Sequence, residues 1–215
     1  MIIAIDGPAA SGKGTLARRL AQHLGLAHLD TGRLYRAVAL RVLTGGAEPA
    51  DPASAEAAAE ALTAADLKDP RLREERVAQA SSVVAAVPAV RQALLAFQRD
   101  FARRPPGGAQ GAVLDGRDIG TVICPDAEAK LFVTATTEAR ARRRFEELRE
   151  SGEPAIYKAV LQDMKVRDAR DSDRRAAPLV PADDAFVLDT TALDADATFA
   201  AALDFVERKL AERRG

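Results

Sequence analysis

Apolar and polar residues alternate along the chain in blocks that predict strands followed by helices. Short apolar runs with the length of buried strands occur at 1–5, 26–29, 112–115, 130–134 and 185–189. Between them, apolar residues recur three and four positions apart, which predicts helices at 13–24, 34–43, 71–104, 137–174 and 194–212. This alternation predicts an α/β fold in which a parallel sheet is covered by helices on both faces.

Glycine and proline mark where these helices begin and end. Gly25 follows the first predicted helix, and Gly45 follows the second. The alanine-rich stretch 47–69 favours a helix that begins at Pro52. Pro88 divides the region 71–104 into two helices, because proline is tolerated only in the first turn of a helix.

The first predicted strand runs directly into a glycine-rich loop and a helix, in the sequence IIAIDGPAASGKGT. Gly7 and Gly12 allow backbone N–H groups to turn toward phosphate oxygens, and Lys13 adds a positive charge. The strict Walker pattern places a hydroxyl directly after the lysine, but here it comes one position later, at Thr15. A glycine-rich turn that binds nothing is the alternative. The strand before, the helix after and the lysine favour a polyphosphate site.

Two further polar segments, 30–36 and 115–121, follow predicted strands. Taken alone, Asp30 or Thr31 would cap the next helix, and the Asp115-Gly116 pair would form an ordinary turn. In an open parallel sheet, however, ligands bind in the crevice at the carboxyl ends of the strands. We therefore expect these segments to contact whatever accepts the phosphate.

The segment 167–174, RDARDSDR, is the fourth candidate. If it is helical, Arg167, Arg170, Asp171 and Arg174 share one face, where the cations repel each other unless an anion lies between them. A solvated helix with Arg/Asp pairs is the usual explanation of such a run. Beside a phosphate loop, we expect a lid whose arginines close over the transferring phosphates.

Composition limits the possible functions further. The 215 residues carry a net charge of -1 and contain no apolar stretch long enough for a bilayer, so we expect neither a nucleic-acid nor a membrane partner. One cysteine and two histidines offer no metal-ligand cluster, and we expect Cys124 to be a small buried hydrophobe. The prediction is a cytoplasmic enzyme without a targeting leader. Of the 31 basic residues, 25 are arginine, which suits planar oxyanions.

Four motifs together carry a family resemblance. GPAASGKGT, LDTGRLYR, LDGRDIGTVICPDA and RDARDSDRRAAPLVPA occur in the order and approximate spacing of the bacterial cytidylate kinases. The resemblance extends along nearly the whole chain. It implies a P-loop NTPase-type core with a parallel five-stranded sheet, and a monomer that transfers the γ-phosphoryl group of MgATP to CMP or dCMP.

The resemblance also implies roles for individual residues. The ATP site comprises Gly7, Pro8, Ala9, Ala10, Ser11, Gly12, Lys13, Gly14 and Thr15, with Thr15 near Mg²⁺. By the same resemblance, the acceptor phosphate is bound by Arg36, Arg117 and Arg174, and the sugar is bound by Arg167 and Asp171. The cytosine is bound by Ser82, Arg91 and Asp118. Thr31 and Tyr35 complete the CMP site, and the catalytic charges are those of Lys13, Arg117, Arg167 and Arg174.

The chain departs from that family in one region. Many members carry an insert of short strands before the segment that matches 77–91. Here the corresponding segment, 64–76, is short and shows no alternating strand pattern. We therefore expect a single domain with a core at 1–44, 88–136 and 176–215, a short helical monophosphate-binding insert at about 45–87, and a lid at about 137–175. A lesser departure is Cys124, where the family pattern has an aromatic residue.

Three other functions are compatible with the loop alone. A kinase of another small acceptor, such as adenylate or shikimate, would share the loop but not the other motifs. A GTPase switch reads guanine through Asn-Lys-x-Asp, and the sequence contains no asparagine. A nucleotide-binding protein without catalysis is the third alternative.

Overall fold

The computed structural model describes residues 1–174 and 176–212. Five strands form one sheet in the order β2-β3-β1-β4-β5, and every pair is parallel. The strands are β1 (Ile2–Asp6), β2 (Ala27–Asp30), β3 (Ala112–Gly116), β4 (Ala129–Thr134) and β5 (Phe186–Asp189). The predicted α/β class and the parallel five-stranded sheet are confirmed.

The strands in the centre of the sheet are in register at their carboxyl ends. Asp6 pairs with Gly116 of β3 and with Phe132 of β4, so the loops that follow these strands leave from one edge. Strands β1 and β2 each end one residue later than the apolar pattern predicts, because the polar residues Asp6 and Asp30 still belong to the ladder.

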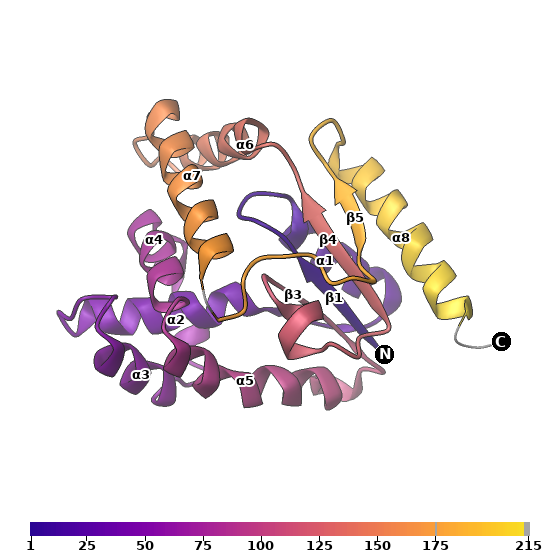
Figure 1. Cartoon of the computed structure of the whole chain (residues 1–215), viewed down its shortest axis with the longest axis horizontal. Coiled ribbons are helices and arrows are strands. Elements are labelled where there is room, and N and C mark those ends of the chain that lie inside the picture. Colours follow the sequence, from indigo (N-terminus) through magenta and orange to yellow (C-terminus); the bar gives the residue numbers. More distant parts are fainter. Residues whose placement is uncertain (175, 213–215) are drawn as a thin grey trace.

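Helices connect and cover the strands (Figure 1). They are α1 (Lys13–Leu24), α2 (Thr31–Thr44), α3 (Pro52–Glu60), α4 (Glu75–Val84), α5 (Pro88–Arg103), α6 (Thr137–Glu150), α7 (Tyr157–Asp173) and α8 (Ala195–Glu212). Helix α2 begins three residues before the predicted start, because the Asp30 side chain caps it by accepting a hydrogen bond from the Arg33 N–H at 3.3 Å.

The two faces of the sheet are covered by different elements. On one face, α1 and α8 pack their apolar residues against β1, β4 and β5 in a cluster that includes Leu20, Leu131 and Val206. On the other face, α5 and a π-helical turn, Ile119–Ile123, contribute Ala102 and Ile119 to a second cluster. That cluster also contains Cys124, which is buried as the sequence predicts.

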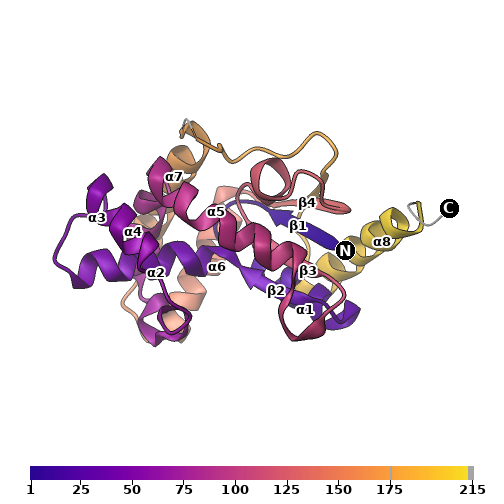
Figure 2. The ribbon, with the colours of Figure 1, turned by 90° about the horizontal axis from the view of Figure 1, so that it is seen from below.

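Helices α2, α3, α4 and α5 share a third apolar cluster, at the end of the molecule opposite α8 (Figures 1 and 2). Val38 of α2, Ala55 of α3, Val77 of α4 and Val90 of α5 are all fully buried in it. The segment 45–87 contains two 3-10 turns and no strand, as its sequence predicts. This segment therefore packs on α2 and α5 through a common core.

Helices α6 and α7 form a hairpin with an apolar cluster of its own, which Ala9 and Ala10 of the loop before α1 also contact. The sequence predicts one helical region at 137–174, but the helix is broken at 151–156. Gly152 adopts φ 78°, which ends a helix readily, and Pro154 cannot donate the next backbone hydrogen bond.

Helix α7 ends at Asp173, one residue before the expected end at about Arg174, and Arg174 has the extended backbone angles φ −62° and ψ 135°. It therefore does not continue the helical face of Arg167, Arg170 and Asp171, although its side chain turns back toward them.

Among the described residues, no single helix has the length and apolar composition needed to cross a bilayer. Helix α4 together with residues 88–108 would meet that test only as a pair bent by 98°. Several apolar residues of this pair, including Val77, Val84 and Leu94, are buried in the cluster that α2 to α5 share.

Candidate active site

The loop between β1 and α1 leaves the start of α1 open. Gly12 caps the helix with φ 90°, no side chain caps it, and its first turn contains no acidic residue. The positive end of the helix dipole is therefore exposed with its unpaired N–H groups. Gly7 has φ 149°, and a Cβ there would lie 2.0 Å from the Val133 carbonyl oxygen, so only glycine fits.

Lys13 begins α1 and points into the loop. Its Nζ donates a hydrogen bond to the Pro8 carbonyl oxygen at 3.2 Å. Burial lowers the pKa of Lys13 to about 7, and repulsion by Arg117 adds to this effect while Asp115 opposes it. The loop thus holds a lysine whose charged form an anionic ligand would stabilise.

A cavity of about 190 Å³ opens beside this loop. Its walls come from α2, α4, α5, α7, the loop before α1 and the segment after β3. All ten residues predicted for the acceptor line it, namely Thr31, Tyr35, Arg36, Ser82, Arg91, Arg117, Asp118, Arg167, Asp171 and Arg174. The structure thus brings together residues that lie up to 143 positions apart, between Thr31 and Arg174.

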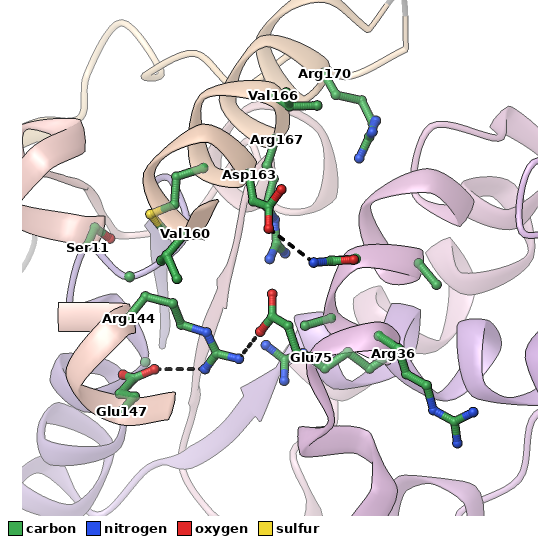
Figure 3. A pocket seen from close by; sticks show the side chains of 18 of the residues that line it. Ser11, Arg36, Glu75, Arg144, Glu147, Val160, Asp163, Val166, Arg167 and Arg170 are labelled. Atoms are coloured by element: carbon green, nitrogen blue, oxygen red, sulfur yellow. Dashed lines mark hydrogen bonds and ion pairs between the residues drawn. The ribbon is translucent and has the colours of Figure 1, made fainter. Parts of the chain in front are cut away.

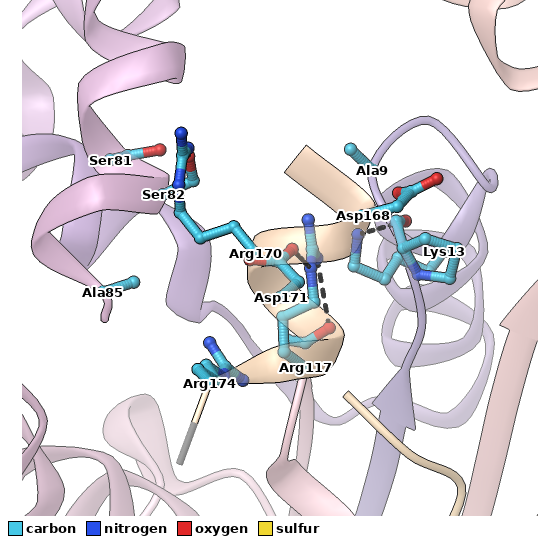
Figure 4. Close-up of polar contacts among 12 residues, drawn as sticks. Ala9, Lys13, Ser81, Ser82, Ala85, Arg117, Asp168, Arg170, Asp171 and Arg174 are labelled. Atoms are coloured by element: carbon cyan, nitrogen blue, oxygen red, sulfur yellow. Dashed lines mark hydrogen bonds and ion pairs between the residues drawn. The ribbon is translucent and has the colours of Figure 1, made fainter. Parts of the chain in front are cut away.

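Charged pairs hold several of these side chains in place. Arg91 Nη2 pairs with Asp118 Oδ2. Arg117 Nε lies 2.9 Å from Asp171 Oδ2, and Figure 4 shows this second pair. Burial works against ionisation of Asp171, but Arg117 and Arg167 together lower its pKa below the usual value. These pairs keep opposite charges fixed where they have little exposure to solvent.

Three polar atoms around the cavity are buried without a hydrogen-bond partner among the described residues. They are Ser11 Oγ of the loop, Arg167 Nε and Arg174 Nη2. Burial also lowers the pKa of Arg167 to about 10, with repulsion from Arg117 in the same direction. Unpaired buried donors are costly, so this arrangement favours an anionic ligand with several acceptor oxygens.

A larger hollow of about 670 Å³ lies next to this cavity, and residues from Ala9 to Thr15 line it together with α4, α6 and α7. Gly7 and Pro8 do not line it; their contribution is the loop geometry described above. Arg36 and Arg167 border both spaces. Figure 3 shows Arg144 of α6 between Glu147 and Glu75, so the wall of the hollow joins α6 to α4.

On another side of the loop is a third hollow of about 370 Å³, lined by Gly12, Thr15, Arg143, Thr190 and further residues of α6 and α8. The Arg143 guanidinium is fixed there because it donates to both the hydroxyl and the carbonyl oxygen of Thr190. A fixed planar guanidinium offers a stacking surface for an aromatic ring.

Four residues at or near the site receive no individual role from the sequence. Asp30 and Asp115, whose carboxylate contacts His28 Nε2 at 2.7 Å, line the acceptor cavity and belong to the segments 30–36 and 115–121 that are expected there from the carboxyl ends of the strands. Ser81 also lines the cavity, and Asp6 is buried behind the loop. Neither Ser81 nor Asp6 is expected at the site from the sequence.

Oxygen ligands for a hard cation lie at the edge of the loop. A Cβ on Gly14 would be 3.9 Å from Asp115 Oδ1, so this buried carboxylate faces the same turn that carries the Thr15 hydroxyl. Among the described residues, no group of three or more His, Cys, Asp or Glu side chains could hold a metal ion. A hydroxyl, a carboxylate and phosphate oxygens form a donor set that suits Mg²⁺.

A phosphate loop at the central strand of a parallel sheet, a helical hairpin above it and a basic acceptor cavity beside it define a P-loop kinase of a small substrate. The family model described as "Cytidylate kinase" matches residues 3–208. The cytidylate kinase of Paramagnetospirillum magneticum is 62% identical over 208 residues, which cover 97% of this chain and 98% of that protein. The cytidylate kinase of Methylocella silvestris is 62% identical over 207 residues, covering 96% and 94%. The chain therefore belongs to the cytidylate kinase family, as its motifs predict.

A solved structure of an uncharacterized protein from Eubacterium ventriosum has a similar fold. The TM-score is 0.52 at 16% identity, and the match covers 96% of this chain and 98% of that chain. At this identity the likeness concerns the fold alone.

Proposed function

We propose that this protein transfers the γ-phosphoryl group of MgATP to CMP or dCMP, giving ADP and the corresponding diphosphate. The observation that supports this most is the cavity of about 190 Å³, because it gathers the ten residues of the predicted acceptor site next to Lys13. Membership of the cytidylate kinase family supports the same acceptor.

The donor phosphates bind at the open start of α1. The N–H groups of the loop and the Lys13 ammonium surround the β and γ phosphates, and the bound anion raises the pKa of Lys13 again. Thr15 and Asp115 are the residues that would hold Mg²⁺. This ion would neutralise charge on the β and γ phosphate oxygens.

Arg36, Arg117 and Arg174 bind the acceptor phosphate. Arg117 now pairs with Asp171, and a phosphate dianion can replace this partner without leaving the guanidinium unpaired. Arg174 contributes the Nη2 atom, which is buried and has no hydrogen-bond partner in the described part of the chain. Positioning of the acceptor oxygen in line with the γ phosphate then supplies most of the catalysis, since this reaction needs little covalent help.

The nucleoside binds in the same cavity, beside Asp118, Arg91 and Ser82. Asp118 accepts a hydrogen bond from the cytosine N4 amine, while Arg91 and Ser82 donate to N3 and O2. The Arg91 guanidinium lies 5.6 Å from the centre of the Tyr35 ring, so Tyr35 supports it from one side. Arg167 and Asp171 bind the sugar hydroxyls, and Thr31, held by its hydrogen bond to the Asp115 carbonyl oxygen, forms the floor.

The adenine of ATP stacks on Arg143. The acceptor cavity occupies the opposite side of the loop, and Arg143 presents a guanidinium that two hydrogen bonds to Thr190 hold in place. The donor base therefore lies between α6 and the start of α8.

The segment 137–175 acts as the lid and the segment 45–87 as the insert that closes over the monophosphate. Support comes from the few contacts between the donor loop and the hairpin of α6 and α7. The small residues Ala9 and Ala10 touch its apolar cluster, and Arg140 Nη1 donates a hydrogen bond to the Ala9 carbonyl oxygen at 3.2 Å. Closure brings Arg167 and Arg170 over the transferring phosphates and excludes water. The monomeric state and the cytoplasmic location stay predictions from the sequence.

A coupled assay of ADP formation with MgATP and a panel of acceptors tests the proposal. CMP and dCMP should be phosphorylated fastest, and faster turnover with AMP, UMP or shikimate would contradict the acceptor. Lys13→Ala should lower kcat about 100- to 1,000-fold, the usual loss for one preorganised charge. The matched control Lys158→Ala changes an exposed lysine at the start of α7 and should keep kcat. Unchanged CMP-dependent turnover in Lys13→Ala would contradict the mechanism.

A further inference from the structure

Asp6 is a buried carboxylate that the mechanism above does not use. It is the last residue of β1 and precedes Gly7, the first residue of the donor loop. Only 5% of it is exposed, and it lines none of the three hollows around the loop. A carboxylate is expensive to bury, so its contacts indicate what it does there.

Both oxygens of this carboxylate accept backbone hydrogen bonds from the same short turn. Oδ1 accepts the N–H of Ile119 at 2.7 Å, and Oδ2 accepts the N–H of Gly120 at 2.8 Å. These are the first two residues of the π-helical turn Ile119–Ile123, which follows Asp118 directly. An amide side chain would place its NH2 group where one of the two carboxylate oxygens lies, and that donor group would face one of the two N–H donors.

The turn that Asp6 holds carries part of the acceptor site. Asp118, one residue before Ile119, pairs with Arg91, and Arg117 pairs with Asp171. Close packing fixes the same segment, since a Cβ on Gly120 would lie 3.4 Å from Asp6 Oδ2 and 3.2 Å from Lys130 Cδ. Glycine at position 120 thus allows the carboxylate to approach the turn.

We propose that Asp6 is a positioning residue that ties the strand before the donor loop to the turn presenting Arg117 and Asp118 to the acceptor. This inference rests on the acceptor site proposed above. Asp6 touches neither substrate. It acts by fixing the backbone of Ile119 and Gly120, so that the side chains just before them meet the nucleotide in one geometry.

The contact also depends on the protonation of Asp6. Burial raises the pKa of this carboxyl to about 7, and the nearby Asp118 adds to the effect. The two N–H groups and Arg117 oppose the rise, and the Lys130 ammonium pairs with Asp184 at 2.9 Å. A protonated carboxyl presents an O–H donor to one of the two N–H donors, so one hydrogen bond is lost as the pH falls.

Asp6→Asn tests the proposal, with Asp184→Asn as the matched control. The control makes the same change on a largely exposed carboxylate that also neighbours Lys130. For Asp6→Asn we expect KM for CMP to rise about tenfold and KM for MgATP to stay within about twofold, because the lost contact is on the acceptor side. Asp184→Asn should keep both constants. An unchanged KM for CMP, or equal rises of both KM values, would overturn the inference.

The pH dependence provides a second readout that a merely structural residue would not show. The acceptor phosphate itself titrates near pH 6, so the informative quantity is the ratio of kcat/KM for CMP between wild type and Asp6→Asn. This ratio should rise with pH and level off above about pH 8. A flat ratio would overturn the proposal, whereas a wild-type enzyme inactive with CMP would instead refute the proposed function.

Gly120→Ala keeps the proposal testable if Asp6→Asn does not fold. The added methyl group leaves the carboxylate in place, crowds Lys130 Cδ at 3.2 Å and comes into contact with Asp6 Oδ2 at 3.4 Å. KM for CMP should again rise severalfold while KM for MgATP stays unchanged. An alanine variant with the wild-type KM for CMP would count against the role of this contact.

Discussion

Individual side chains of the acceptor cavity are held by protein partners that a substrate can replace. Arg91 pairs with Asp118 and Arg117 with Asp171, each pair with little exposure to solvent. A buried charge without a partner is costly, so these pairs stabilise the side chains around the cavity. When an arginine changes its carboxylate partner for a phosphate of the nucleotide, little free energy is lost in reorganisation.

Asp6 leads to a prediction for stability. Its pKa is 3.8 as the reference value of an unfolded chain and about 7 in the folded protein. Between these values the folded state binds more protons, so the free energy of unfolding falls as the pH rises through this window. Relative to Asp6→Asn, the wild type should lose at most about 1.4 kcal/mol per pH unit. Urea unfolding of both proteins at about pH 5, 6 and 7 measures this difference.

The raised pKa would be contradicted if the free energy of unfolding of the wild type, relative to that of Asp6→Asn, stayed constant or increased as the pH rises. Asp184→Asn serves as the control, because interaction with Lys130 lowers the pKa of that carboxyl. As the pH rises from 5 to 7, the free energy of unfolding of the wild type should not fall relative to that of Asp184→Asn.

The sequence identifies some site residues from position and others only through the family motifs. Asp30 shows why: its side chain caps α2, as the helix-cap interpretation expects, and the residue also lines the cavity beside Thr31. Ser82 and Arg91 lie on amphipathic helices, where spacing alone does not distinguish a binding face. Neither position nor the family motifs identify Asp6, because its hydrogen-bond partners are 113 and 114 positions away.

At the scale of elements, one face of α4 contacts both helices of the lid. Glu75 pairs with Arg144 of α6, the Gln79 amide donates to Asp163 of α7 at 3.3 Å, and Ser82 contacts Arg170 of α7. Residues four and three positions apart share a helix face, so a single face of α4 makes all three contacts. The insert and the lid are thus joined across the hollow of about 670 Å³.

Arg144→Ala should open the lid more often in the free protein. The change removes the ion pair with Glu75 while the apolar cluster of α6 and α7 stays intact. We expect a glutamate-specific protease to cut the connection 151–156, at Glu153, a few times faster than in wild type. Arg142→Ala, an exposed arginine of the same helix, should leave the rate unchanged.

A bisubstrate analogue should slow this cleavage in both wild type and Arg144→Ala, because substrates hold the lid closed from inside the cavity. Equal cleavage rates of the free wild type and Arg144→Ala would show that the Glu75 pair does not restrain the lid. Equal rates with and without the analogue would contradict the movement of the lid itself.

Most elements are predicted from the apolar pattern, and those that differ have local causes. The strands and α1, α5 and α8 lie within a few residues of their expected ends, whereas α3 begins at Pro52 as expected but occupies only part of the stretch 47–69 and ends at Glu60. The π-helical turn 119–123 is not predicted, because it depends on Asp6 from a distant strand. The break between α6 and α7 follows from Gly152 and Pro154, which the arginine-rich pattern around them conceals.

For the whole molecule, the order of the strands decides where the substrates meet. Strand β1 lies between β3 and β4, so its loop faces the segments after β2 and β3 on one side and the lid after β4 on the other. The acceptor side is built largely on the cluster of α2 to α5, whereas α8 packs with β1, β4 and β5 at the opposite end (Figure 1).

This division predicts where CMP alone stabilises the protein. Tyr35 and Arg36 of α2, Ser82 of α4 and Arg91 of α5 line the acceptor cavity, and α8 does not. At about 100 times its Kd, a ligand adds roughly 2.7 kcal/mol to any opening that destroys its site. Hydrogen exchange in α2, α4 and α5 should therefore slow up to about 100-fold with CMP, while exchange in the last turns of α8 should not change. Protection of α8 equal to that of α2 would mean that the molecule opens as one unit, and no protection in α2 would place the acceptor elsewhere.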